Sequence, residues 1–208
     1  MSQHKQPDYW QSACRALSRA DPVMARLIRA YPDVALKSRG NAFETLLRAI
    51  VGQQISVKAA DAVWARVCAA TAVQPETVAA LSIDALRACG LSRMKASYAI
   101  DLAGHFVSGK IRPRRWARME DEAIIAELVD VRGIGRWTAE MFLIFHLLRP
   151  NVWPVDDLGL LKALGLHYRG GERIGAKEAR ALGETWQPWR TVATWYLWRS
   201  LDPVAVEY

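Results

Sequence analysis

Apolar side chains recur at helical spacing along most of the chain. In the segment FETLLRAIV (43–51), four of them fall at positions i, i+3, i+4 and i+7, which places them on one face of a helix. A second apolar stripe runs through residues 57–70, after the polar stretch GQQIS interrupts the pattern. No convincing two-residue alternation of a strand appears. The pattern therefore predicts an all-α protein.

Capping residues indicate where the later helices begin and end. Ser82 and Ser92 each precede an apolar helical segment, and Gly90 and Gly109 follow one, as is typical of N-caps and C-terminal glycines. Further helical segments are expected at 120–131, 136–148, 155–166 and 186–201. The last of them has Pro188 near its first turn. The basic stretch 110–119 is expected to be a connector between helices. We expect about ten short helices in two lobes.

Composition narrows the class of protein. The 208 residues are 51% apolar and carry a net charge of +7, so a folded core is expected and a polyanion is a favoured partner. The three cysteines have no C-x-x-C spacing, which disfavours zinc and iron–sulfur sites. Neither a signal peptide nor a bilayer-spanning apolar run is found, and we expect an intracellular protein.

The glycines in LVDVRGIGRWTAEMFLIF (128–145) interrupt a helical pattern at one point. Gly133 and Gly135 flank Ile134 in a short turn between two apolar runs. The N-terminus of the second helix would present backbone N–H groups and partial positive charge to an anion such as phosphate. An ordinary turn between two helices without a ligand explains the same pattern.

Several motifs together resemble one family. VRGIGRWTA (131–139) resembles the helix-hairpin-helix of DNA base-excision glycosylases, and RPNVWPVDDLGL (149–160) resembles the Gly/Pro-rich loop and aspartate that follow it. LLRAIVGQQIS (46–56) is similar to the family's helix-and-wedge segment, and 186–198 to its last helix. The resemblance covers roughly residues 40–200 and is closest to the DNA-3-methyladenine glycosylase II group, in a compact form without an N-terminal β-domain.

This resemblance implies an architecture and an activity. The fold would be two-lobed and helical with the active-site cleft between the lobes, in a single glycosylase domain (1–208) of two interleaved subdomains. The central lobe would span about 40–120, and the hairpin and catalytic lobe about 121–200 plus the N-terminal helices. The enzyme would flip alkylated purines such as 3-methyladenine and 7-methylguanine out of double-stranded DNA and cleave their N-glycosidic bond, leaving an abasic site.

One acidic residue would perform the chemistry. By its matching position Asp157 would be the catalytic aspartate, stabilising an oxocarbenium-like transition state, with Asp156 capping or supporting it. Without the resemblance, either residue could simply cap the following helix. Trp137 stands where strand-cleaving relatives carry a Schiff-base lysine, which implies a monofunctional enzyme without lyase activity.

The resemblance also assigns residues to the base and to the DNA. The base pocket would contain Trp137, Trp198, Met141 and Tyr98, whose aromatic members suit a cationic methylated purine. Gln54 would be the intercalating wedge. Gly133, Gly135, Arg132, Arg136 and Thr138 would contact DNA, and the carbonyls of Val129, Val131 and Ile134 would hold a monovalent cation such as sodium or potassium.

The remaining expectations concern partners and alternatives. We expect no other cofactor, no iron–sulfur cluster, no membrane association, and a monomer that is cytoplasmic if bacterial and nuclear if eukaryotic. Two other functions stay open at this point: a glycosylase of the same fold for oxidised or deaminated bases, and a non-catalytic helix-hairpin-helix DNA-binding module.

Overall fold

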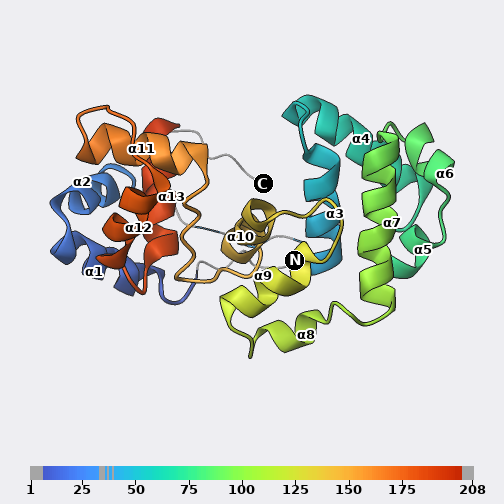
Figure 1. Ribbon diagram of the computed structural model, residues 1–208, viewed down its shortest axis with the longest axis horizontal. Helices are drawn as coiled ribbons and strands as arrows, with labels where there is room; N and C mark the ends of the chain where they lie inside the picture. Colours follow the sequence, from blue (N-terminus) through green and yellow to red (C-terminus); the bar gives the residue numbers. More distant parts are fainter. Residues whose placement is uncertain (1–6, 33–35, 37, 39, 203–208) are drawn as a thin grey trace. The chain divides into compact units, whose positions relative to one another are not determined.

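The computed structural model describes residues 7–32, 36, 38 and 40–202. Thirteen helices and no strand form in this part of the chain (Figure 1). The all-α prediction is therefore confirmed, although about ten helices were expected. The chain folds as two compact units: unit 1 comprises residues 1–38 and 143–208, and unit 2 comprises residues 39–142.

Unit 1 is built around its C-terminal helix, α13 (Arg190–Leu201). Residues 191–197 of α13 are all buried, as expected for a helix surrounded by protein. Its neighbours are α1 (Trp10–Ala20), α2 (Pro22–Ala30) and α11 (Leu158–Tyr168), and α12 (Ala176–Glu184) packs on α11. Aromatic rings fill the space between them, with Trp10 edge-on to Trp195 at 5.5 Å between ring centroids.

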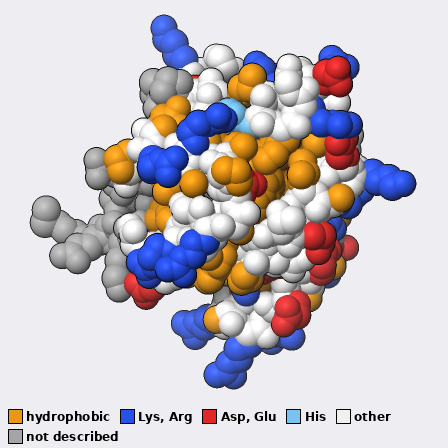
Figure 2. Space-filling model, turned by 90° about the vertical axis from the view of Figure 1, so that its left-hand side faces the viewer, with side chains coloured by type: hydrophobic (Ala, Val, Ile, Leu, Met, Phe, Trp, Pro, Cys, Tyr) orange, Lys and Arg blue, Asp and Glu red, His pale blue; other side chains and the backbone are white. Residues whose placement is uncertain are grey.

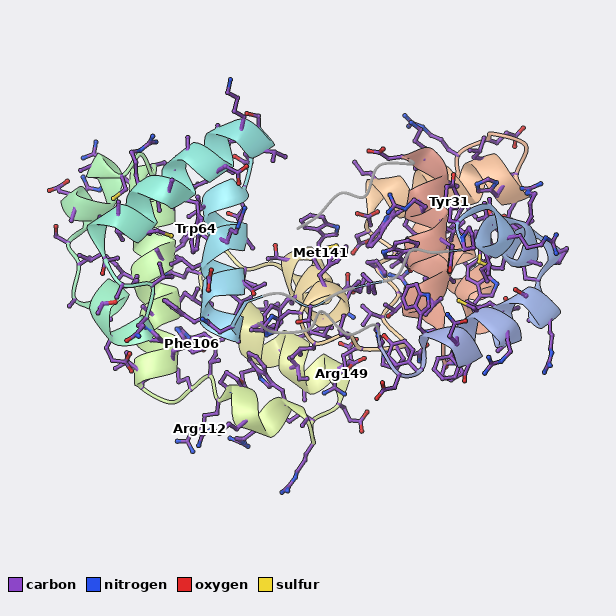
Figure 3. All side chains as sticks on the ribbon, turned by 180° about the vertical axis from the view of Figure 1, so that it is seen from behind. Tyr31, Trp64, Phe106, Arg112, Met141 and Arg149 are labelled. Carbon is purple, nitrogen blue, oxygen red and sulfur yellow. The ribbon has the colours of Figure 1, made fainter. Side chains whose placement is uncertain are left out.

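Unit 2 is built around α7 (Arg93–Val107), which packs against α3, α5 and α6. Its other helices are α3 (Ala42–Gly52), α4 (Val57–Ala70), α5 (Pro75–Ala79), α6 (Ile83–Ala88), α8 (Pro113–Trp116), α9 (Asp121–Val129) and α10 (Arg136–Phe145), the last three residues of which belong to unit 1. Trp64 of α4 and Phe106 of α7 lie among these helices (Figure 3). Phe106 packs edge-on against Phe43, with 5.2 Å between ring centroids.

Local capping residues determine where several helices begin or end. The Ser82 and Ser92 hydroxyls accept hydrogen bonds from the backbone N–H groups of Ala85 and Lys95, so both predicted N-caps are confirmed. The interruption at GQQIS is also confirmed, because α3 ends at Gly52 and α4 begins at Val57.

Two expectations about the elements were wrong, and one helix was not predicted. The connector 110–119 contains the short helix α8, because the buried Trp116 anchors it and donates from Nε1 to Glu127 Oε1 at 3.0 Å. Pro188 lies ahead of α13, which begins only at Arg190. The helix α12 was not predicted, since its sequence is polar with few apolar positions.

The turn between α9 and α10 is anchored to α7 within unit 2. Asp101 of α7 accepts from the Arg132 backbone N–H at 2.9 Å, and His105 Nε2 lies 3.1 Å from Asp130 Oδ2. The hairpin belongs with α7 to unit 2, which spans residues 39–142. Within the described residues, no helix is both long enough and apolar enough to cross a bilayer.

Candidate functional site

Asp157 lies at the start of α11 in unit 1. Its Oδ1 accepts a hydrogen bond from the Leu160 backbone N–H at 2.6 Å and another from Trp198 Nε1 at 2.8 Å. The carboxylate therefore caps its own helix and is held by a second helix, α13. Both contacts are made by the same carboxylate oxygen, Oδ1.

The neighbouring acid behaves differently. Asp156 is exposed, and the residue that caps α11 is Asp157. The expectation that Asp156 caps the helix was wrong. An N-cap side chain accepts a hydrogen bond from the N–H of the second or third helical residue, and in this turn Asp157 occupies the N-cap position.

Trp198 is part of an aromatic stack that the sequence did not predict. Its ring lies parallel to Phe145 at the end of α10, with 5.8 Å between centroids and 9° between planes. Gly159 makes room for this arrangement, because a Cβ there would lie 3.1 Å from Asp157 Oδ1 and 3.4 Å from Trp198 Cδ1. The structure thus brings Asp157, Trp198, Phe145 and Gly159 together in unit 1. Only the helical spacing of Phe145 was visible in the sequence, and it indicated no contact with Trp198.

The hairpin turn of unit 2 depends on Gly133. Its φ is +86°, in the left-handed region that favours glycine. The Tyr98 ring lies so close that any Cβ at Gly133 would overlap it. Tyr98 therefore packs against the hairpin backbone. Val131 and Ile134 are buried beneath the same turn.

Gly135 differs from Gly133, because the space where a side chain would lie is open. A Cβ built on Gly135 meets no heavy atom within 4 Å beyond its immediate neighbours. It directly precedes α10, and glycine has no side chain with which to cap a helix. Trp137 and Thr138 follow in the first turn, with Trp137 40% exposed. The N-terminus of α10 can thus be approached closely by an anion.

Two predicted DNA-contacting arginines have partners inside unit 2. The Arg136 guanidinium donates to both carboxylate oxygens of Glu122 and, through Nε, to Glu140 at 3.0 Å. The Glu122 carboxylate raises the pKa of Arg136, and Arg136 in turn lowers the pKa of Glu122. Arg132 Nε pairs with Asp101 Oδ1 at 3.1 Å. Their contacts with phosphate stay predictions.

The loop between α3 and α4 carries the predicted wedge. Gln54 is exposed at its tip, with a left-handed φ of +57° that is uncommon for a residue other than glycine. Beside it, Gln53 Nε2 donates to the Gly133 carbonyl at 2.8 Å. Lys95 Nζ donates to the carbonyls of Val51 and Gln53, and burial lowers its pKa. Sequence reasoning missed the hydrogen bond from Gln53 to the Gly133 carbonyl, which links the wedge loop to the hairpin.

The remaining predicted site residues belong to unit 2. Met141 lies on α10 and is 7% exposed (Figure 3). The Val131 carbonyl, one of the three predicted cation ligands, accepts a hydrogen bond from the Ile134 N–H at 3.1 Å, and a carbonyl has a second lone pair for a cation. Among the described residues, no group of three or more His, Cys, Asp or Glu side chains could hold a metal ion.

Figure 2 shows how charged side chains are distributed over one face of the molecule. On the face drawn in Figure 2, Lys and Arg side chains are scattered around exposed apolar patches, with acidic side chains between them. The net charge of +7 therefore gives a general attraction to polyanions.

Comparisons with known proteins identify the family. Residues 47–188 match the model of the HhH-GPD superfamily base excision DNA repair protein. The chain is 32% identical over 182 residues to DNA-3-methyladenine glycosylase 1 of Schizosaccharomyces pombe (strain 972 / ATCC 24843), covering 85% of this chain and 80% of the relative. A curated Bacillus subtilis (strain 168) relative is longer, and the match covers 59% of its length.

Solved structures are similar as well. The crystal structure of the DNA-3-methyladenine glycosidase from Bacillus halodurans has a TM-score of 0.86 and 34% identity, covering 91% of this chain and 89% of that one. The Schizosaccharomyces pombe 3-methyladenine DNA glycosylase Mag1, in complex with abasic DNA, has a TM-score of 0.76 and 31% identity, covering 94% and 100%.

Proposed function

Because the chain belongs to the HhH-GPD superfamily of base excision DNA repair proteins, we propose that it is a monofunctional DNA glycosylase for alkylated purines. It hydrolyses the N-glycosidic bond of 3-methyladenine and 7-methylguanine in double-stranded DNA and leaves an abasic site. Similar proteins named as DNA-3-methyladenine glycosylases support the substrate class. The observation that carries the proposal is the Asp157 carboxylate, fixed by two N–H donors beside the indole of Trp198.

Asp157 supplies the charge that the reaction needs. As the bond from C1′ to the purine nitrogen breaks, its electron pair leaves with the base and positive charge develops on the sugar. The carboxylate stabilises that charge, a water oxygen bonds to C1′, and Asp157 accepts the proton that the water loses. An alkylated purine is already cationic and leaves as a neutral base, so no strong general acid is required.

Aromatic rings suit the cationic base. A ring face attracts a positive charge by about 0.5–2 kcal/mol, and the Trp198–Phe145 stack lies next to Asp157. We assign Trp137, Met141 and Tyr98 to the rest of the base pocket. Trp137 cannot form a Schiff base with the sugar, and we therefore expect hydrolysis without strand cleavage.

The hairpin and the wedge loop act on the DNA backbone and stack. Phosphate binds at the start of α10, where Gly135 leaves open space, with Gly133, Thr138, Arg132 and Arg136 around it. Flipping a base costs a few kcal/mol. The exposed Gln54 fills the gap that the flipped base leaves, and its link through Gln53 to Gly133 supports this position.

Several accompanying features belong to the proposal. A monovalent cation is held by the Val129, Val131 and Ile134 carbonyls near the bound phosphate, and neither another cofactor nor an iron–sulfur cluster is needed. The chain acts as a single domain and a monomer. It is an intracellular enzyme, cytoplasmic in a bacterium or nuclear in a eukaryote.

The first test measures base release from duplex DNA methylated to contain 3-methyladenine and 7-methylguanine. We expect the wild-type protein to release both bases, and Asp157→Asn to release them at least about 100-fold more slowly. Asparagine still caps α11, so the variant should fold and bind DNA. Asp156→Asn is the matched control, because it removes the same charge from the adjacent exposed residue, and it should keep the activity.

Other results would favour another function. Met141 is buried and is the non-aromatic member of the proposed base pocket, so the lesion preference needs a test of its own. If wild type releases neither base but binds DNA, the alkylpurine proposal is wrong. The same assay with oxidised or deaminated bases then separates a glycosylase for other lesions from a non-catalytic binding module.

A further inference from the structure

Two hydrogen bonds reach Asp157 Oδ1 from different helices. The Leu160 donor is the backbone N–H of α11 itself, 2.6 Å away, and the Trp198 donor is the indole N–H of α13, 2.8 Å away. Trp198 is 41 positions from Asp157 in the sequence. The second contact therefore connects the carboxylate to the central helix of unit 1.

The second donor restricts a rotation that the cap alone leaves free. The terminal torsion of an aspartate is broad, because it joins an sp³ to an sp² carbon. A single cap bond to Leu160 is compatible with a range of carboxylate orientations. A donor on another element narrows that range and determines which way the second oxygen points.

Trp198 is itself held in place. Its ring stacks on Phe145 at 5.8 Å between centroids, and α13 is buried along residues 191–197. Gly159 keeps donor and acceptor in reach, since a Cβ there would lie 3.1 Å from Asp157 Oδ1 and 3.5 Å from Trp198 Nε1. A larger residue at 159 would press between the two groups.

We propose that Trp198 is a positioning residue for Asp157 and acts through its indole N–H, separately from any contact of its ring face with the base. Phe145 and Gly159 serve the same purpose by fixing the indole and by leaving space beside it. This inference rests on the proposed function, because it concerns the carboxylate that the reaction uses. It predicts that the N–H and the ring of Trp198 contribute to different steps.

Two analogues placed at position 198 alone separate these contributions. Benzothienylalanine keeps the fused ring but replaces the N–H by sulfur, whereas 7-azatryptophan keeps the N–H and weakens the ring face. We expect benzothienylalanine to slow single-turnover base release by about 10- to 100-fold, the range for a lost hydrogen bond to a charged group. Its affinity for abasic DNA should not change. The 7-aza analogue should recover most of the rate.

The control is Trp189→Phe. Trp189 lies at the start of the same helix, α13, and its ring stacks on Tyr9 rather than on Phe145. It should release base at the wild-type rate. If benzothienylalanine supports a rate within twofold of tryptophan, the positioning role is wrong. An equal loss with both analogues would also overturn it, because the rate would then not follow the presence of the indole N–H.

A readout independent of activity separates this inference from the proposed function. In nuclear magnetic resonance spectra of the wild-type protein, the Trp198 indole N–H should shift as the Asp157 carboxylate is protonated in an acid titration. In Asp157→Asn that shift should be absent. If the Trp198 resonance shifts but the protein releases no methylated base, the contact between Trp198 and Asp157 is supported and the alkylated purines are rejected as substrates. No shift in the wild type overturns the inference whatever the activity.

Discussion

The helices α10 and α11 begin in opposite ways, although both follow a tight turn. Asp157 precedes α11 and supplies a carboxylate to its first N–H groups. Gly135 precedes α10 and supplies no side chain, and a Cβ there would meet open space. One helix therefore carries its own anion at the N-terminus, and the other can receive an anion from outside.

This difference shows how one backbone feature can serve two tasks. A helix N-terminus has N–H groups without intrahelical partners and partial positive charge. At α11 these groups hold a carboxylate in place, which suits a residue that must face a developing charge. At α10 they remain accessible, which suits a phosphate that binds and leaves. The predictions below test whether the two helix starts have these separate tasks.

The largest expected effect is on the stability of the hairpin. Gly133→Ala forces a left-handed alanine and places its methyl group against the Tyr98 ring. We expect the free energy of unfolding to fall by about 3 kcal/mol, combining backbone strain with overpacking, as measured by urea denaturation. Gly135→Ala is the matched control and should cost much less, at most about 1 kcal/mol for the poorer N-cap residue. Equal losses in both variants would contradict the assigned difference between the two glycines.

The second prediction gives α10 a carboxylate of its own. Gly135 has no positive φ, so Gly135→Asp should be tolerated and should cap the helix. The carboxylate would then occupy the anion site, and we expect affinity for duplex DNA at low salt to fall by about 10- to 100-fold, as for a lost charge-assisted hydrogen bond. Gly135→Asn adds a neutral cap of similar size and should weaken binding less. If both variants bind DNA like the wild type, the start of α10 is not the phosphate site.

A smaller effect should follow from cutting the link between the wedge loop and the hairpin. Gln53→Leu removes the hydrogen bond to the Gly133 carbonyl, which should lower the free energy of unfolding by about 1 kcal/mol. Because Gln54 would lose its support, flipping of a fluorescent base analogue should also slow. Gln53→Glu has the same length but no amide donor, and it should show the same defect. Unchanged flipping in both variants would mean that the loop does not need this link.

Sequence reasoning found the parts of the site that local chemistry determines. The serine caps and the glycine turn follow from neighbouring residues, and they appear where they were expected. The wedge role of Gln54 rests on the resemblance and stays a prediction. The pairing of Asp157 with Trp198 joins residues 41 positions apart, and only resemblance placed both in one site.

Contacts that depend on packing between helices could not be predicted in this way. Phe145 against Trp198, Gln53 on the Gly133 carbonyl and Arg136 on Glu122 each join separate elements. Helical periodicity tells which face of a helix is apolar, but it does not tell which residue of another helix lies opposite. The contacts of α7 with the hairpin turn are of the same kind.

The smallest effect concerns the ion pair that holds Arg136 at the start of α10. Arg136 lowers the pKa of Glu122 below its ordinary value, so the pair stabilises the folded state at neutral pH, and the contribution is lost as the pH falls through that lowered pKa. The Glu122 side chain is 71% exposed, and we expect Glu122→Gln to cost at most about 0.5 kcal/mol at pH 7. Urea denaturation of both proteins should show this difference shrinking below about pH 4, near the ordinary pKa of a glutamate. A difference that persists at pH 3 would mean that Glu122 contributes through packing rather than through its charge, and that Arg136 is held mainly by Glu140.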